Sequence, residues 1–461
     1  MSIATDVTED YIPPHPAPFT ARPSLPELVR RMRRSLLEIW HERHFEEPFF
    51  ATRLLARRFF ICNSPETVHA AFVANNAAFE RKTPEMRHAL EPLVGDGLII
   101  SDGLVWRERR RVVAPVTHVS RIHALAPVMT EVVAERGEAW AARPADAPVD
   151  MLTEMGEMAA EVICRSVFGR RLGSDSARQV VRAFARYQRG SGVGGLLALL
   201  GLPGLLPRLR AWRLRGEVRR IHEVLDRLIA EALGAPAGET SLIRAMAEAE
   251  LRDSGQPMSP AAFRNEAATL FLAGHETTAG TMAWAWFLLS QSPVAAARLR
   301  AEAVSVLGGR AARFEDLPAL PFTRAVVEET LRLYPPIPLL AREAQQDVEL
   351  AGQPVPKGGI VMVVPWLLHR HRALWPKPDH FLPERFLPDA PPRPRHAFIP
   401  FSLGPRVCTG AHFAMAEAVI CLATLAQRFA PRLAPGTQVF PVCRLTLRPG
   451  ERLPMLLDRV A

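Results

Sequence analysis

The chain reads FSLGPRVCTG at residues 401–410, a stretch that places one cysteine between two glycines. Gly404 and Gly410 permit backbone conformations and close approaches that a side chain would forbid. The N–H groups of such a loop can hydrogen-bond a sulfur atom, and a helix expected from Ala411 would add the positive end of its dipole. We therefore predict that Cys408 presents a thiolate to a metal.

Two further motifs lie upstream of this loop. Residues 273–278 read AGHETT, and residues 329–332 read ETLR. In this order and at these separations, the three motifs resemble those of the cytochrome P-450 family, the haem-thiolate monooxygenases. Weaker matches extend the resemblance from about Trp106 to about Pro449. The departure is Ser402, where the family usually has glycine.

The resemblance implies a set of residues that bind the cofactor, haem b. Cys408 would be the axial ligand of the haem iron, within a loop that includes Phe401 and Gly410. A thiolate ligand favours O–O cleavage, which distinguishes such enzymes from oxygen carriers with a histidine ligand. The family's Trp-x-x-x-Arg pattern and two other propionate-binding positions match Trp106, Arg110, Arg342 and Arg406. The alternative for the arginines is that they are solvated surface residues.

A long helix is expected between Ser259, a candidate N-cap before Pro260, and Ser290, since Pro293 follows. Its length would be roughly 45 Å. Midway, Ala273 and Gly274 leave room for a flat macrocycle.

The middle of this helix also carries the residues that the family uses to activate oxygen. Thr277 can hydrogen-bond the carbonyl one turn back. The resemblance implies that Glu276 delivers protons and that Thr277 holds oxygen and a water. The alternative is a polar patch satisfied in the core. A zinc-protease motif is excluded, because position 279 is alanine and not the second histidine.

Glu329 and Arg332 are three residues apart on an expected helix that ends at Tyr334-Pro335-Pro336, so they share a face. Such pairs are common at protein surfaces. The resemblance implies instead a buried structural triad completed by Arg385, which serves haem retention and folding. Losing one partner would then leave a buried charge unpaired, at a cost of about 3–5 kcal/mol.

The composition and pattern predict one large fold. The chain has 461 residues, 48% of them hydrophobic, which is enough for a sizeable core. We expect an irregular arm over residues 1–23 and a single haem domain over 24–461, in which Ser24 and Glu27 open a helix to about His44. Helical periodicity dominates residues 105–335, and short strand-like pieces follow. The fold class is therefore mainly α with a small β subdomain, with the haem between the long central helix and the helix after the cysteine loop.

The charge balance is basic, with a net charge of +9. Lysine occurs only three times among the 57 basic residues, and no nucleic-acid-binding signature appears. No fused reductase signature is present, so electrons from NAD(P)H would come through a separate ferredoxin or flavodoxin. An acidic partner of this kind could dock on arginines near the cysteine loop, while a general arginine bias is the alternative. These arginines are Arg107, Arg109, Arg111, Arg393 and Arg395.

A cytoplasmic location is expected. The N-terminal residues carry acids without an 18-residue apolar run, and the five cysteines are odd in number, without the spacing of a disulfide framework. In the family, the apolar segment 192–207 would be the lid over the distal pocket. This segment could contact a membrane surface together with Leu28, Met32, Leu36 and Trp40. The alternative is that these residues pack in the protein core.

These observations favour a monooxygenase that inserts one oxygen atom from O2 into a hydrophobic substrate, by hydroxylation or epoxidation. The alternatives are a haem-thiolate peroxygenase or isomerase, and a non-catalytic haem sensor or electron carrier. The candidate substrate-pocket residues are apolar and flank the motifs; they are Leu272, Ala273, Ile337, Leu339 and Leu445.

Overall fold

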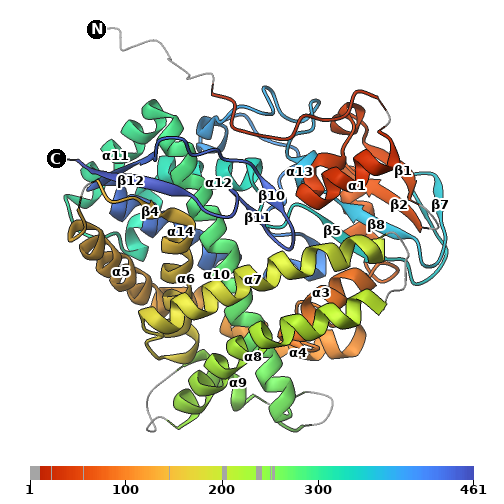
Figure 1. The fold of residues 1–461 in the computed structure, drawn as a ribbon, viewed down its shortest axis with the longest axis horizontal. Helices are drawn as coiled ribbons and strands as arrows, with labels where there is room; N and C mark the ends of the chain where they lie inside the picture. Colours follow the sequence, from red (N-terminus) through yellow and green to blue (C-terminus); the bar gives the residue numbers. More distant parts are fainter. Residues whose placement is uncertain are drawn as a thin grey trace.

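The computed structural model describes residues 11–460 except residues 22, 55–56, 145, 200–204, 235–240, 250 and 252–254. Helices dominate it (Figure 1). They are α1 (Leu25–Arg34), α2 (Pro65–His69), α3 (Pro84–Val94), α4 (Gly103–Val116), α5 (Val119–Ala141), α6 (Met151–Phe168), α7 (Ser174–Leu199), α8 (Leu205–Leu233), α9 (Leu242–Ala247), α10 (Pro260–Gln291), α11 (Pro293–Leu307), α12 (Pro321–Leu333), α13 (Pro365–Leu368) and α14 (Ala411–Ala426). The expected mainly α fold is confirmed.

The strands are short and form small sheets. They are β1 (Phe49–Leu54), β2 (Arg57–Cys62), β3 (Arg81–Lys82), β4 (Val149–Asp150), β5 (Leu340–Glu343), β6 (Val348–Leu350), β7 (Gln353–Val355), β8 (Ile360–Val363), β9 (Phe429–Leu433), β10 (Val442–Cys443), β11 (Leu447–Arg448) and β12 (Pro454–Arg459). The largest sheet has the order β1-β2-β8-β5-β3, in which β2 and β8 are parallel and the other pairs antiparallel. A second sheet has the order β4-β12-β9, and β10 pairs with β11 as β6 does with β7.

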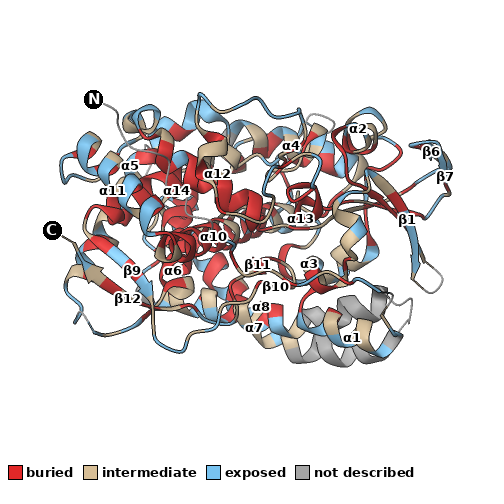
Figure 2. Cartoon of the chain, turned by 90° about the horizontal axis from the view of Figure 1, so that it is seen from above, coloured by how far each residue is buried: buried red, intermediate tan, exposed pale blue. Residues whose placement is uncertain are grey.

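The central helix α10 forms as the sequence predicts. The Ser259 side chain accepts a hydrogen bond from the Ala262 N–H at 3.3 Å, and Pro260 takes the first helical position. At 1.5 Å per residue the helix is about 48 Å long. It runs through the middle of the molecule and is buried along most of its length (Figures 1 and 2). It packs against α6, α12 and α14, so residues at its centre lie deep in the fold.

The prediction of a helix from Ser24 to about His44 is wrong beyond Arg34. The Ser24 cap forms, since its side chain accepts the Glu27 N–H at 3.4 Å. Ser35 then leaves the helical region (φ −157°, ψ 135°), and its hydroxyl accepts the N–H groups of Leu37 and Cys443. A serine that bonds nearby backbone competes with helix continuation, and only 3₁₀ turns follow.

The N-terminal arm is only partly within the described residues, because residues 1–10 lie outside them. Its described part packs on the body of the molecule. Phe19 is buried and forms a bridge with His41, and the Tyr334 hydroxyl donates to the Pro14 carbonyl at 2.8 Å. The boundary at residue 23 stays a prediction.

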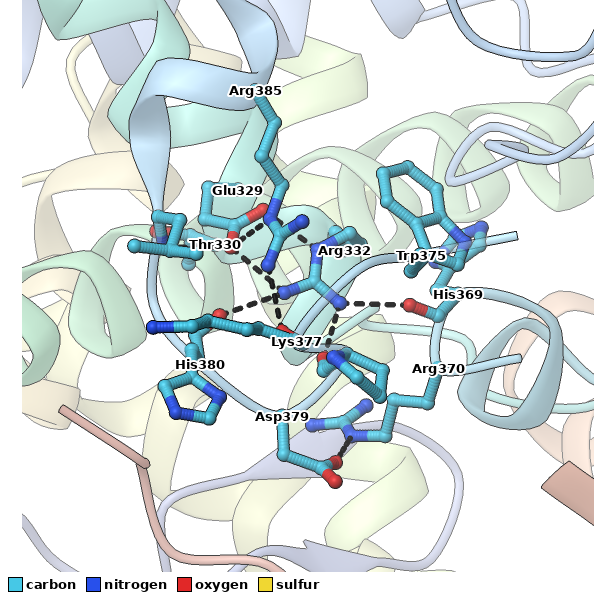
Figure 3. Close-up of polar contacts among 12 residues, drawn as sticks. Glu329, Thr330, Arg332, His369, Arg370, Trp375, Lys377, Asp379, His380 and Arg385 are labelled. Carbon is cyan, nitrogen blue, oxygen red and sulfur yellow. Dashed lines mark hydrogen bonds and ion pairs between the residues drawn. The ribbon is translucent and has the colours of Figure 1, made fainter. Parts of the chain in front are cut away.

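Glu329 and Arg332, both on α12, lie together with Arg385 (Figure 3). Glu329 and Arg332 have no exposed surface, and Arg332 binds both carboxylate oxygens, at 2.6 and 2.7 Å. The Arg385 Nε lies 3.3 Å from the same carboxylate. The predicted triad is therefore assembled, and its role in haem retention and folding stays a prediction.

Arg332 also fixes the irregular segment that leads to the cysteine loop. Its guanidinium donates to the carbonyls of His369, Pro378 and His380 at 2.8, 2.6 and 2.9 Å (Figure 3). The His369 ring in turn accepts the Ile399 N–H at 2.9 Å, and burial lowers the pKa of His369 to about 3, which keeps the ring neutral. A buried charge on α12 thus orders the backbone up to the start of the loop.

Candidate functional site

The cysteine loop is a tight turn that lies against the segment after α2. The Cys408 N–H donates to the Phe401 carbonyl at 2.9 Å, and the Val407 N–H donates to the Gly404 carbonyl at 3.0 Å. Gly404 has φ +66°, and a Cβ there would lie 2.4 Å from the Phe72 carbonyl oxygen. Only glycine fits this position.

Two other loop residues depart from expectation. Ser402, at the position where the family usually has glycine, adopts φ +62° and keeps its hydroxyl buried without a hydrogen-bond partner among the described residues. Gly410 has φ −91°, and a Cβ there would make an ordinary 3.9 Å contact with the Cys408 sulfur. The expectation of a backbone conformation that a side chain would forbid is therefore wrong for Gly410.

The Cys408 side chain is accessible from a cavity, in contrast to the other four cysteines, which are buried. Burial within the surrounding protein raises the pKa of its thiol, while a hydrogen bond from the Gly410 N–H and the charge of Arg110 act in the opposite direction. Two groups are thus already placed to stabilise a thiolate once a metal binds the sulfur.

The cavity beside Cys408 has a volume of about 1380 Å³. Ala273 and Thr277 of α10 line it, and so do the cysteine loop and the residues after α12. The five apolar residues predicted for the substrate pocket all line this cavity; they are Leu272, Ala273, Ile337, Leu339 and Leu445. The sequence did not indicate other parts of the apolar wall, among them those from α3 and from the loop before α4, which includes Leu98 and Ile99.

The four predicted propionate-binding residues meet at one edge of the cavity. The Arg406 guanidinium stacks on the Trp106 ring at 4.0 Å and lies 3.2 Å from Asp102. Arg342 is 3% exposed, and burial lowers its pKa to about 10. The positive charge of Arg110 favours the thiolate form of Cys408.

Lys82 joins this edge, and motif reasoning missed it. Its ammonium is buried, and burial together with the charges of Arg342 and Arg406 lowers its pKa well below the ordinary value. Asp102 accepts the Lys82 N–H at 3.1 Å. The sequence does contain one signal for Lys82, because a lysine is rare in this arginine-rich chain.

This edge of the cavity fits a haem. Positive side chains outnumber the acids around Asp102, and the Arg406 Nε is buried without a hydrogen-bond partner among the described residues. Two carboxylates on a bound ligand would pair with this excess charge. The cavity extends from here to the accessible sulfur of Cys408, as a ring with a thiolate-ligated metal and propionate groups requires.

The centre of α10 has the predicted features, with one correction. The Thr277 hydroxyl donates to the Ala273 carbonyl at 2.7 Å. Gly274, however, is needed for helix packing: a Cβ there would lie 2.6 Å from the Ile163 Cδ1 of α6. The missing side chain at Gly274 therefore brings α6 close to α10 and does not only make room in the cavity.

Glu276 is held by partners from distant parts of the chain. Arg448 of β11 donates from Nε and an NH2 group to its two oxygens at 2.9 and 2.8 Å. Thr446 and Gln188 donate to it at 2.7 and 2.9 Å. Burial alone would raise the pKa of Glu276, but Arg448 and the hydrogen bonds outweigh it and lower the pKa. No motif marks these three partners in the sequence.

Of the five arginines predicted to dock an electron donor, Arg109 is wrong. Arg109 is 7% exposed and lies near Asp96 and Glu266, at 3.3 and 3.6 Å. It belongs to the interior of the protein because α4 turns it toward α10. The other four arginines are more exposed, and two of them have acidic partners: Arg107 pairs with Glu80 and Arg111 with Glu108.

Of the apolar segment 192–207, residues 200–204 lie outside the described residues, and only the backbone of the remainder is described, as parts of α7 and α8. The four residues considered with it for membrane contact line the cavity; they are Leu28, Met32, Leu36 and Trp40. Within the described part of the chain, no helix has the length and apolar character to cross a bilayer.

Comparison with known proteins identifies the family of this chain. The profile described as Cytochrome P450 matches residues 13–450. The chain is 35% identical to "Cyclooctatin synthase" of Streptomyces melanosporofaciens over 86% of each chain. It is 32% identical to "Cyclooctat-9-en-7-ol 5-monooxygenase" of the same organism over 79% of each, and 30% identical to "Pentalenene oxygenase" of Streptomyces avermitilis over 79% of this chain and 80% of that one. The chain therefore belongs to the cytochrome P450 family and is a P450 monooxygenase, and the family implies a haem cofactor.

Proposed function

We propose that this enzyme binds haem b through Cys408 and inserts one oxygen atom of O2 into a cyclic hydrocarbon, or into an alcohol derived from one. Electrons would come from NAD(P)H through a separate ferredoxin or flavodoxin, in the cytoplasm. The observation that carries the proposal is the cavity that joins the Cys408 sulfur to Ala273 and Thr277 of α10.

The substrate class rests on the cavity wall and on the relatives. The wall beside α10 is apolar at Leu98, Ile99, Leu272, Ile337 and Leu445, and such a wall binds hydrocarbon surface by removing it from water. Two relatives carry the names of an alkene and a cyclic alkenol, pentalenene and cyclooctat-9-en-7-ol. A neutral ring compound with at most one hydroxyl agrees with both observations.

Each site residue has a role in the proposed reaction. Cys408 would hold the haem, which would supply the chemistry of O2 activation when bound, and its thiolate would donate electron density to the iron. Lys82, Arg110, Arg342 and Arg406 would hold the propionates and fix the orientation of the ring.

The two residues on α10 would handle protons. Glu276 stays ionised beside Arg448, so its carboxylate is able to accept a proton from the solvent side and pass it inward. Thr277 keeps its hydroxyl proton on the Ala273 carbonyl, which leaves the hydroxyl oxygen free to accept a hydrogen bond in the cavity.

The electron donor would dock beside the cysteine loop. Val407 is 39% exposed there, and Leu104 and Val105 of α4 are 68% and 47% exposed. Arg107, Arg111, Arg393 and Arg395 would add positive charge for an acidic partner. Reduction rates that do not change with ionic strength would contradict this docking mode.

A binding and turnover assay tests the substrate class. The ferric enzyme is titrated with pentalenene, with cyclooctat-9-en-7-ol and with palmitate as an acidic control, and spin-state shifts are recorded. We expect shifts for the ring compounds, and oxygenated products containing ¹⁸O when the reaction runs under ¹⁸O2 with NADPH and a surrogate redox system. A shift and product with palmitate alone would contradict the proposal.

A further inference from the structure

Glu266 of α10 is a buried carboxylate outside the oxygen-activation motif. It has no exposed surface, and its Oε2 accepts the Leu98 N–H at 3.1 Å. Its Oε1 has no hydrogen-bond partner among the described residues. Burial of the carboxyl raises the pKa of Glu266 to about 7. An acid in such a place is costly to the fold, so its contact with Leu98 calls for a physical reason.

A simple ion pair with Arg109 does not account for this placement. The Arg109 Nε lies 3.6 Å from Glu266, beyond hydrogen-bond distance, whereas its terminal nitrogens reach Asp96 and the Met258 sulfur at 3.3 Å. The one hydrogen bond that Glu266 makes among the described residues goes to the Leu98 backbone.

The segment around Leu98 lies directly on α10. The Asn265 side chain donates to Asp96 at 2.8 Å. A Cβ on Gly97 would lie 2.2 Å from the Thr269 Oγ1 and 2.9 Å from the Asn265 carbonyl oxygen. The backbone immediately before Leu98 is therefore in close contact with α10 beside the Glu266 hydrogen bond.

This segment is also a wall of the cavity. Leu98 and Ile99 line it, and Thr269, Leu270 and Ala273 of α10 line it beside them. We propose that Glu266 is a positioning residue for substrate selection, which holds the Leu98–Ile99 wall against α10 and thereby sets the width of the cavity beside the haem. The inference uses the proposed function only in taking this cavity as the substrate site.

The first test measures amide hydrogen exchange of the holoenzyme over residues 94–101. Replacing Glu266 with alanine removes the acceptor of the Leu98 N–H, and we expect exchange of this segment to be about tenfold faster. E266Q keeps an acceptor oxygen and should restore protection to within about twofold. Unchanged exchange in E266A would overturn the proposal.

The second test measures the cavity itself with two ligands of haem iron, imidazole and the bulkier clotrimazole. The ratio of their Kd values, read from the Soret shift, should change by about fivefold in E266A and stay within about twofold in E266Q. If E266A does not fold, E266D serves instead, because its shorter side chain withdraws the carboxylate from the Leu98 N–H.

E161A is the matched control. Glu161 of α6 also accepts backbone N–H groups, those of Leu172 and Gly173 at 3.1 and 3.2 Å, but it does not line the cavity. An equal change of the Kd ratio in E161A would contradict the proposal, since it would reflect general loosening. Absence of any azole shift in every variant would count against a haem with an accessible iron in this cavity, and so against the proposed function, and the exchange experiment would still decide the role of Glu266.

Discussion

Glu266 and Glu276 are two buried carboxylates on the same helix with opposite behaviour. Glu276 has two hydrogen bonds from Arg448 and others from Thr446 and Gln188, and its pKa is lowered. Glu266 has one backbone hydrogen bond and an arginine at 3.6 Å, and its pKa is raised to about 7. The number and charge of the donors, and not burial as such, decide whether a carboxyl on α10 is ionised.

The largest effect is expected from removing Arg448. R448M leaves Glu276 buried without its cation, which should lower the free energy of unfolding by about 3–5 kcal/mol. Urea unfolding at pH 7 measures this. E276Q in the R448M background should recover most of the loss.

R452M is the control for that experiment, because the Arg452 side chain is 76% exposed and its ion pair with Asp150 is long, at 3.7 Å. The substitution should lower the free energy of unfolding by less than about 1 kcal/mol. An R448M protein as stable as the wild type would mean that the ion pair does not hold Glu276.

The pH dependence of stability should separate the two acids. Glu266 holds a proton in the folded protein that the unfolded chain releases between pH 4.5 and about 7, so its contribution to stability falls as pH rises through this window, by about 3 kcal/mol. Arg109 from α4 and Asp96 from the adjacent loop are the charged groups that act on it. E266Q should flatten this part of the curve.

The lowered pKa of Glu276 has the opposite sign. Its ion pair stabilises the protein above the ordinary pKa of 4.5 and is lost as pH falls below it. E276Q should therefore alter only the acidic limb of the curve. Unfolding curves recorded from pH 2 to pH 9 test both statements, and identical curves for the two variants would refute the comparison.

Turnover should depend on Glu276 as a proton carrier. E276Q is expected to slow product formation by about 10²-fold and to raise the solvent isotope effect, measured with NADPH and a surrogate redox system. E266Q should keep the wild-type solvent isotope effect. E161Q, altered on α6 outside the cavity, is the control for nonspecific loss.

The smallest effect is expected from Ser402 in the cysteine loop, another buried polar group that lacks a hydrogen-bond partner among the described residues. Ser402 has φ +62° and a buried hydroxyl without a hydrogen-bond partner among the described residues, so S402G should stabilise the protein by about 1 kcal/mol. Thermal unfolding measures the change. A loss of stability would indicate that the hydroxyl has a partner once haem is bound.

The sequence predicts those parts of the structure in which local chemistry determines geometry. Ser259 and Pro260 mark the start of α10, and the spacing of Glu329 and Arg332 brings them together on α12. The loop around Cys408 follows from Gly404, which no other residue could replace. The length of the first helix could not be read in this way, because Ser35 bonds to Cys443, a residue at the far end of the chain.

Partners from distant segments are likewise invisible in the sequence. Arg448 and Gln188 reach Glu276 only after β11 and α7 have packed against α10. Arg109 looked like a surface charge, and only the position of α4 shows that it faces Glu266. Charge and spacing identify candidate residues, whereas tertiary packing assigns their partners.

The spectrum of the dithionite-reduced protein under carbon monoxide tests the central claim most directly, because the Soret position reports the ligand opposite CO. The account predicts the long-wavelength band of a thiolate ligand in the wild type and its loss in C408A, with C443A, altered at a buried cysteine, retaining it. A band typical of histidine ligation in the wild type, or a long-wavelength band that survives in C408A, would contradict the assignment of Cys408.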